Sequence, residues 1–112
     1  MIKDPVIYLK HIQTSIWRIA DTISGIREET FANNYQIHDV VIHELEVIGE
    51  ACRNLEKEFI DTHPEIPWSQ IIASRNLLIH EYWGVDLAEV WHTATQDLPK
   101  LHDQIAQLID SE

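Results

Sequence analysis

The sequence lacks most features of a membrane protein, of a disulfide-bonded secreted protein and of a protein attracted in bulk to nucleic acid. Its one cysteine, Cys52, excludes an internal disulfide and fits a reducing cytoplasm. It has no run of about 18 apolar residues and no basic-then-apolar N-terminus, so we expect a cytoplasmic chain without a membrane partner. Only eight lysines and arginines stand against 19 aspartates and glutamates, a formal net charge of −11. Any nucleic-acid contact must therefore come from a local cleft or from a basic partner.

What the chain does contain is enough apolar material for a folded core. Hydrophobic residues make up 45% of its 112 residues, and there are only three glycines, which indicates a globular rather than a disordered chain. This length predicts one domain spanning residues 1–112, with a real but small core.

Apolar residues recur at alternating steps of three and four in four segments, which predicts helices and no strand. The first segment opens with Asp4 as N-cap and Pro5 at the first helical position, and the polar pair Asn33-Asn34 links it to the second segment. The apolar stripes of these two segments are Leu9, Ile12, Ile16, Ile19, Ile23 and Ile26, then Val41, Leu45, Ile48, Cys52, Leu55 and Phe59.

The other two segments follow a short polar loop. Pro67 starts the third, which we expect to run to about Tyr82 before Gly84 breaks it, and Asp86 caps the fourth. Pro99 interrupts the fourth segment while its stripe stays in phase, so we expect a kink with helix on both sides. That stripe is Leu87, Trp91, Ala94, Leu98, Leu101, Ile105 and Leu108. Four amphipathic helices with short links predict an all-α fold, an antiparallel four-helix bundle with room for a face shared with a second copy.

The third segment carries an arginine in the middle of its packing face. At about 100° per residue, its apolar residues form one stripe with Arg75 at the centre. The stripe consists of Trp68, Ile71, Ile72, Leu78, Ile79 and Tyr82. A charge in such a place is costly unless it is paired or lines a cleft. Because a guanidinium offers a planar fork of donors matched to phosphate oxygens, we predict a phosphate-handling site at Arg75.

His80 adds a group that can take or give a proton near neutral pH. RNA carries its own nucleophile, the 2′-hydroxyl, so an arginine and a histidine are a sufficient kit for cleaving it without a metal or other cofactor. Five residues of straight helix place Arg75 and His80 roughly 140° apart, so they share a site only if the helix distorts near His80 or a second subunit contributes. Tyr82 lies about 20° from Arg75 and should neighbour it.

The spacing also leaves ordinary structural explanations open. Arg75 could pair with a carboxylate at a helix interface, His80 could cap a helix C-terminus, and Tyr82 could be a packing aromatic. The His-Glu pairs at 43–44 and 80–81 begin like a zinc-protease motif, but neither is followed by the second histidine. We therefore expect no metal site.

A set of longer motifs is more specific than the spacing of Arg75 and His80. In chain order these motifs are Leu45-Glu46-Val47-Ile48-Gly49-Glu50-Ala51, Ile66-Pro67-Trp68, Arg75-Asn76-Leu77-Leu78-Ile79-His80-Glu81-Tyr82, Gly84-Val85-Asp86, Trp91 and Asp97-Leu98-Pro99. By their order and spacing, the chain from about Val40 to Ile109 resembles the HEPN domains of the HepT type, which are the toxin halves of MntA–HepT toxin–antitoxin pairs. The first segment matches only in pattern.

This resemblance implies an all-α bundle that forms a homodimer and brings two such motifs to one cleft. It implies metal-independent cleavage of an RNA substrate, with Arg75 and His80 catalytic and Asn76 in support. It also implies an MntA-type nucleotidyltransferase antitoxin that silences the toxin and can attach AMP to the tyrosine of the motif, here Tyr82. The commoner family pattern has a basic residue followed by asparagine where this chain has His43-Glu44. That departure bears on RNA affinity rather than on the identity of the active site.

Two further functions fit the residues. In one, the chain is a non-catalytic helical partner that presents Tyr82 to a nucleotidyltransferase, which the strong negative charge favours. In the other, it is a helical dimerisation domain without chemistry, so that an apolar residue in place of Arg75 would stabilise the fold.

Overall fold

A computed structural model describes residues 4–80 and 84–112, with the backbone alone for residues 76–80. These residues form helices and contain no strand, which confirms the predicted all-α class. The elements are α1 (Pro5–Ile23), α2 (Glu28–Asn33), α3 (Tyr35–Arg53), α4 (Lys57–Thr62), α5 (Trp68–His80), α6 (Leu87–His92), the π-helical turn η2 (Thr93–Asp97) and α7 (Leu98–Ser111).

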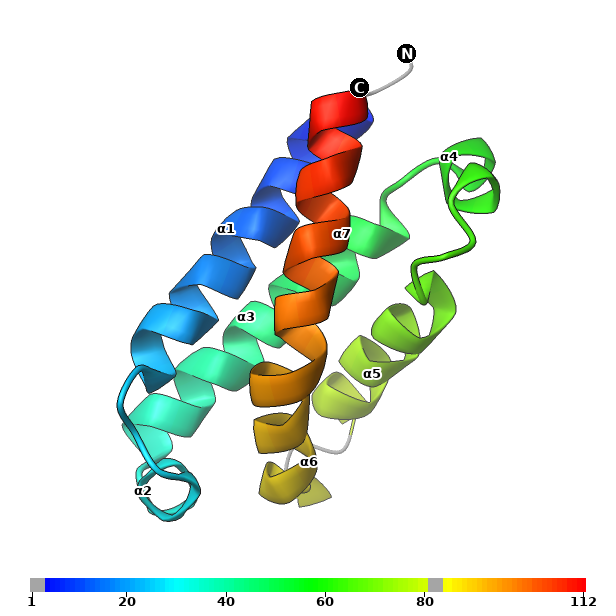
Figure 1. Cartoon of the computed structure of the whole chain (residues 1–112). Coiled ribbons are helices and arrows are strands. Elements are labelled where there is room, and N and C mark those ends of the chain that lie inside the picture. Colours follow the sequence, from blue (N-terminus) through cyan, green and yellow to red (C-terminus); the bar gives the residue numbers. More distant parts are fainter. Residues whose placement is uncertain (1–3, 81–83) are drawn as a thin grey trace.

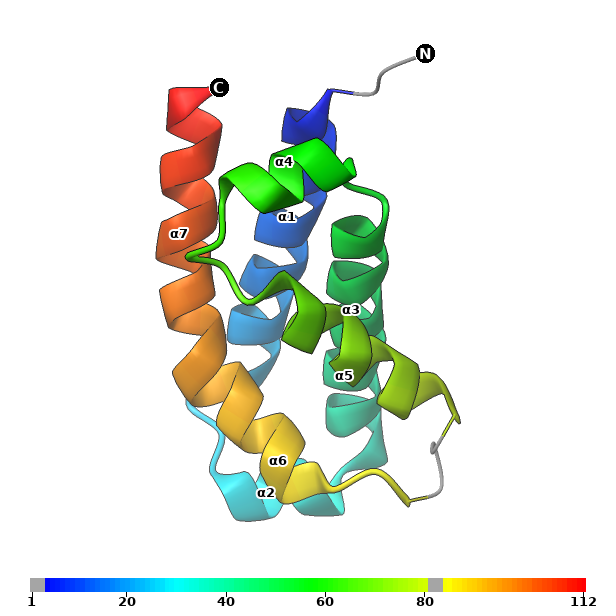
Figure 2. The ribbon, with the colours of Figure 1, turned by 90° about the vertical axis from the view of Figure 1, so that its right-hand side faces the viewer.

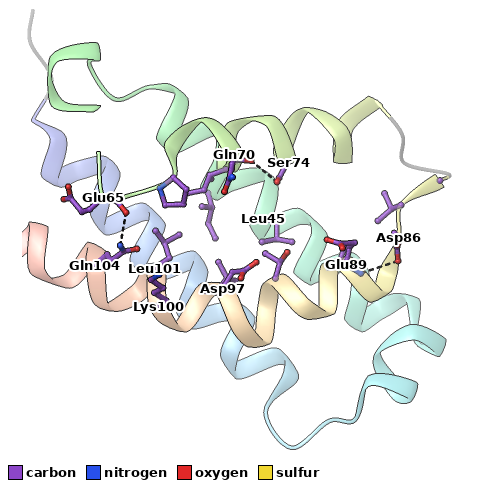
Figure 3. A pocket seen from close by; sticks show the side chains of 18 residues that line it. Leu45, Glu65, Gln70, Ser74, Asp86, Glu89, Asp97, Lys100, Leu101 and Gln104 are labelled. Carbon is purple, nitrogen blue, oxygen red and sulfur yellow. Dashed lines mark hydrogen bonds between the residues drawn. The ribbon is translucent and has the colours of Figure 1, made fainter. Parts of the chain in front are cut away.

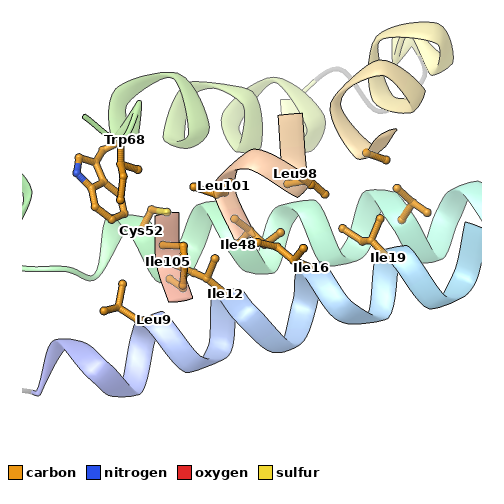
Figure 4. Packing of buried hydrophobic residues seen from close by; sticks show 14 of the residues in the cluster. Leu9, Ile12, Ile16, Ile19, Ile48, Cys52, Trp68, Leu98, Leu101 and Ile105 are labelled. Atoms are coloured by element: carbon orange, nitrogen blue, oxygen red, sulfur yellow. The ribbon is translucent and has the colours of Figure 1, made fainter. Parts of the chain in front are cut away.

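Helix α1 begins where the sequence predicts. The carboxylate of Asp4 accepts a hydrogen bond from the backbone N–H of Val6 at 2.9 Å, and Pro5 is the first helical residue. The stripe of α1 supplies part of the buried core, together with residues of α3, α5 and α7 (Figure 4). The buried residues drawn and labelled there are Leu9, Ile12, Ile16, Ile19, Ile48, Cys52, Trp68, Leu98, Leu101 and Ile105.

The second predicted helix is in fact two. The predicted stripe runs from Val41 to Phe59, but helix α3 ends at Arg53 and Phe59 belongs to the separate short helix α4. Asn54 is the C-cap at this break: both its backbone N–H and its side-chain amide donate to the carbonyl of Glu50, at 3.1 and 3.0 Å, and the N–H of Leu55 then turns back to the carbonyl of Cys52. The polar link before α3 also differs from a plain loop, since it contains α2 and then Asn34, whose side chain accepts from two backbone N–H groups at the start of α3.

The fourth predicted helix continues through Pro99 with a π-helical turn just before the proline. In η2 the backbone N–H of Leu98 bonds to the carbonyl of Thr93, five residues earlier. This wider turn accommodates a proline, which has no N–H to donate and crowds the preceding turn. The axis of α6 departs from that of α7 at this point (Figure 2), so the expected change of direction is present.

The helices form an antiparallel bundle that is open along one side. Helix α1 packs on α3 and on α7, and α3 packs on α5 (Figure 1). Within the described residues, α5 and α7 make little direct contact, so the bundle is closed on three sides only. None of the described helices is both long enough and apolar enough to cross a membrane.

Candidate active site

The start of α5 is fixed against the core by its first residue. Trp68 is only 4% exposed, and its indole N–H donates to the backbone carbonyl of His63 at 2.9 Å. The ring of Phe59 packs against the edge of the same indole. A buried tryptophan with a satisfied N–H is a rigid anchor, and it sets where the rest of α5 crosses α3.

Helix α5 crosses α3 at Gly49. A Cβ atom added to Gly49 would overlap the Cβ of Arg75, would lie 2.7 Å from its Cγ and would lie 3.4 Å from the carbonyl oxygen of Ile71. Only a glycine leaves room for α5 to approach this closely. The approach places the start of the Arg75 side chain directly on the surface of α3.

The guanidinium of Arg75 reaches the next residue of α3. Its Nη2 lies 2.9 Å from Oε2 of Glu50, and the two side chains are 20% and 46% exposed. The structure therefore contains the carboxylate pairing at a helix interface that the sequence left open for Arg75. A guanidinium carries five N–H donors, so contact with one carboxylate is compatible with holding an anion as well.

Arg75 follows the described half of the predicted apolar stripe. The other half of that stripe, Leu78, Ile79 and Tyr82, lies outside the described side chains and stays a prediction. Ile71 and Ile72, which precede it on α5, are half-buried against the core. Water is partly excluded around the guanidinium, and charge–charge and charge–phosphate interactions are stronger there than in bulk solvent. The arrangement can hold a negatively charged group at the edge of the α3–α5 interface.

The remaining motif residues are placed less fully. The side chains of Asn76 and His80, and Tyr82 as a whole, lie outside the described residues, so the predicted neighbourhood of Tyr82 and Arg75 stays a prediction. The backbone of α5 is α-helical as far as His80. Because an α-helix turns about 100° per residue, positions 75 and 80 are roughly 140° apart around the axis of α5. The two ways in which they could share a site, a distortion of the helix near His80 or a contribution from a second copy of the chain, both stay predictions.

The two residues that depart from the family pattern face in different directions. His43 is exposed, whereas Glu44 is buried on the side of α3 that faces α1. Oε2 of Glu44 lies 3.8 Å from Nη1 of Arg18, and Oε1 has no hydrogen-bond partner in the described part of the chain. Glu44 is therefore part of the α1–α3 packing, and only His43 is available to a ligand.

The cysteine is a core residue. Cys52 is fully buried, and burial raises the pKa of its thiol to about 12. A thiol with so high a pKa is neutral at physiological pH and is a poor nucleophile and metal ligand. Among the described side chains, those of residues 4–75 and 84–112, no three of histidine, cysteine, aspartate or glutamate lie close enough together to hold a metal ion.

Comparison with known proteins identifies the family. A family model described as "Ribonuclease HepT-like" matches residues 12–108. The chain belongs to the HepT-like ribonuclease family. It is 35% identical to "Putative RNase TTE0752" of Caldanaerobacter subterraneus, over 99% of each chain. It is 38% identical to "Probable ribonuclease HepT" of Thermococcus cleftensis, over 90% of this chain and 92% of the relative. No solved structure gives a significant match.

In this HepT-like chain, the structure adds two residues to the surroundings of Arg75 that sequence reasoning had left without a role. Gly49 and Glu50 lie within the motif Leu45 to Ala51, and their relation to Arg75 appears only once α3 and α5 are packed. One signal was present in the sequence, because a glycine in the interior of a helix is unfavourable and often marks a close approach of backbones.

Proposed function

We propose that the chain is a metal-independent endoribonuclease toxin that acts as a homodimer. Membership of the HepT-like ribonuclease family supports the activity. The observation that carries the proposal is the half-buried guanidinium of Arg75, held in the α3–α5 interface 2.9 Å from Glu50. A cation in this setting is suited to stabilising the extra negative charge of a phosphate under attack.

The chemistry needs one base, one acid and one cation. His80 takes the proton of the 2′-hydroxyl as its oxygen bonds to the adjacent phosphorus. The bond from phosphorus to the 5′-oxygen breaks, and that oxygen takes a proton from a water molecule in the cleft, while His80 returns its proton to the solvent. The products are a 2′,3′-cyclic phosphate and a 5′-hydroxyl. Arg75 neutralises the crowded phosphate during the transfer, and Asn76 supports the site with a polar side chain.

The test is cleavage of RNA in EDTA, followed by analysis of the new ends. Removing a catalytic group costs about 10² to 10⁴ in rate, so Arg75→Ala and His80→Ala should reduce cleavage by at least about a hundredfold. Arg53→Ala and His92→Ala are matched controls, because both residues are exposed, and they should cleave like the wild type. Intact RNA with the wild-type chain, or equal cleavage by Arg75→Ala, would refute the proposal.

A mixing experiment tests the shared cleft. If Arg75 of one copy works with His80 of the other, a heterodimer of Arg75→Ala and His80→Ala contains one intact site of two. Random mixing of the two inactive variants should then restore about a quarter of wild-type activity. If both groups act within one copy, mixing restores none.

We also propose that an MntA-type nucleotidyltransferase silences this chain by attaching AMP to Tyr82, as in a type VII toxin–antitoxin pair. Tyr82 is two residues beyond His80 in the motif, so phosphates attached to it would bring charge and bulk to the cleft. Mass spectrometry after co-expression with such an enzyme should show added AMP on the wild type and none on Tyr82→Phe.

A second function, that of a non-catalytic partner of the nucleotidyltransferase, is favoured by the negative charge of the chain. The net charge of −11 opposes RNA binding, and a carboxylate already occupies one side of Arg75. Modification of Tyr82 in a chain that neither cleaves RNA nor harms cells when unmodified would establish this alternative.

A further inference from the structure

The open side of the bundle contains an apolar groove. It lies between α5 on one side and α6, η2 and α7 on the other, with α3 as its floor (Figure 3). Its volume is about 690 Å³. Its apolar lining includes Leu45, Ile48, Ile71, Val90, Leu98 and Leu101. Leu45 and Ile71 are only half-buried, so apolar surface remains accessible inside the groove.

The rim of the groove is acidic. Among the described residues, four carboxylate residues line it, Glu65, Asp86, Glu89 and Asp97, against a single ammonium, that of Lys100. A groove with apolar walls and a negatively charged rim favours occupants that are apolar on one face and positively charged beside it. A second copy of this chain carries a net charge of −11 and would meet the rim with like charge.

We propose that this groove binds a cationic amphipathic helix of a partner protein. Helix-in-groove binding uses an apolar face at positions i, i+3, i+4 and i+7, and lysines or arginines beside that face would meet the acidic rim. A helix about 10 Å wide with a rise of 5.4 Å per turn occupies roughly 420 Å³ per turn. About half of each turn would lie inside the groove, so the groove volume of about 690 Å³ accommodates about three turns.

This interaction surface does not include the side chain of Arg75. Among the described residues, α5 contributes Gln70, Ile71 and Ser74 to the groove wall, roughly 140°, 40° and 100° from Arg75 around the helix axis. Position 80 lies about 120° from Ser74 on the other side of the same axis. An occupied groove leaves Arg75 and its contact with Glu50 in place, so the inference stands whether or not the chain cleaves RNA.

The test uses the full chain and two synthetic 14-residue helical peptides. Both carry leucines at i, i+3, i+4 and i+7, and the other positions are lysine in one peptide and glutamate in the other. Ser74→Trp fills the groove from the exposed wall of α5, and Ser69→Trp places the same bulk on the same helix outside it. Glu89→Lys with Asp97→Lys reverses the rim, and Glu28→Lys with Glu29→Lys makes the same change of net charge on α2.

The lysine peptide should bind the wild type and the two controls, Ser69→Trp and Glu28→Lys with Glu29→Lys, with dissociation constants within about twofold of one another. Its dissociation constant should be at least about tenfold higher for Ser74→Trp and for Glu89→Lys with Asp97→Lys. Equal binding by the two charge variants would show attraction to net charge alone and would overturn the proposal. So would the absence of binding, or equal binding of the glutamate peptide. If Ser74→Trp leaves peptide binding unchanged but converts a dimer of the chain to a monomer in sedimentation, the occupant is a second copy and the proposal is wrong.

Discussion

Gly49 of α3 and Arg75 of α5 lie in direct contact, because the glycine has no Cβ at the point where the Arg75 side chain begins. The contact fixes the position of the guanidinium before any ligand is present. Arg75 is thus held by two neighbouring residues of α3, one through its lack of a side chain and one through its charge. Four predictions follow from this contact and from the rest of the core.

Gly49→Ala should destabilise the chain although alanine is the better helix former. Helix propensity favours alanine by about 1 kcal/mol, while overpacking of a tight contact costs about 1–3 kcal/mol, and here the added Cβ would overlap the Cβ of Arg75. Because the overlap is severe, we expect a net loss near the upper end of the difference, about 2 kcal/mol in the free energy of unfolding by urea. Gly84→Ala is the control, because an added Cβ there meets no atom within 4 Å. Equal effects at the two glycines would contradict this account.

Glu50→Gln should lower RNA cleavage more than it lowers stability. Glu50 is 46% exposed, so the loss of its ion pair with Arg75 should change the free energy of unfolding by less than about 1 kcal/mol. If the carboxylate orients the guanidinium, kcat should fall by about tenfold with little change in KM, and Glu50→Asp should recover part of it. Glu46→Gln, one turn earlier on α3, is the matched control. A lower KM with unchanged kcat would show that Glu50 competes with the phosphate instead.

Glu44→Met should stabilise the chain by about 1–3 kcal/mol, because it replaces a buried carboxylate with an apolar side chain of similar size. Arg18→Met should do the opposite, since it leaves that carboxylate in the α1–α3 interface without its cation. A double-mutant cycle measured by thermal unfolding gives the coupling between the two residues. If Glu44→Met is instead less stable than the wild type, the attraction between Glu44 and Arg18 exceeds the free energy needed to bury the carboxylate.

Stability should fall at alkaline pH because of Cys52. Its folded-state pKa of about 12 is above the value of about 8.5 for an exposed thiol, so the folded chain retains a proton that the unfolded chain releases. The contribution is fully present below pH 8.5 and is lost as the pH rises toward 12, at about 1.4 kcal/mol per pH unit. The free energy of unfolding between pH 8 and 10.5 should therefore fall more steeply for the wild type than for Cys52→Ala. Parallel slopes would rule out this contribution.

Much of the fold follows from local patterns in the sequence. The Asp4-Pro5 start of α1 and the Asp86 cap of α6 lie where their capping chemistry predicts, and the carboxylate of Asp86 accepts from the N–H groups of Ala88 and Glu89. The error at the second helix arose because the apolar period continues past the point where the helix ends. Phe59 keeps the period of α3, yet α3 ends at Arg53, six residues before Phe59, with Asn54 as its C-cap.

The candidate site was predictable only in part, because its geometry depends on contacts between segments. Periodicity placed Arg75 in a packing face, and the structure finds it half-buried there. The identity of its carboxylate partner depends on how α5 crosses α3, which no local pattern of α5 specifies. The same applies to Val90, which is buried in addition to the predicted stripe residue Trp91. Trp91 is half-buried and packs on Phe31, and the extra residue of η2 shifts the register of α6 relative to α7.

The extra width of η2 makes this stretch of the fourth helix tolerant of losing one residue. A π-helical turn holds one residue more than a regular turn, so deleting one residue within Thr93–Asp97 would restore ordinary α-helix. Because the wide turn absorbs that residue, α6 would keep nearly the same rotation relative to α7 and Val90 would still face the core. The same deletion inside the regular turns of α6 would instead rotate the residues before it by about 100° and carry them off the apolar face.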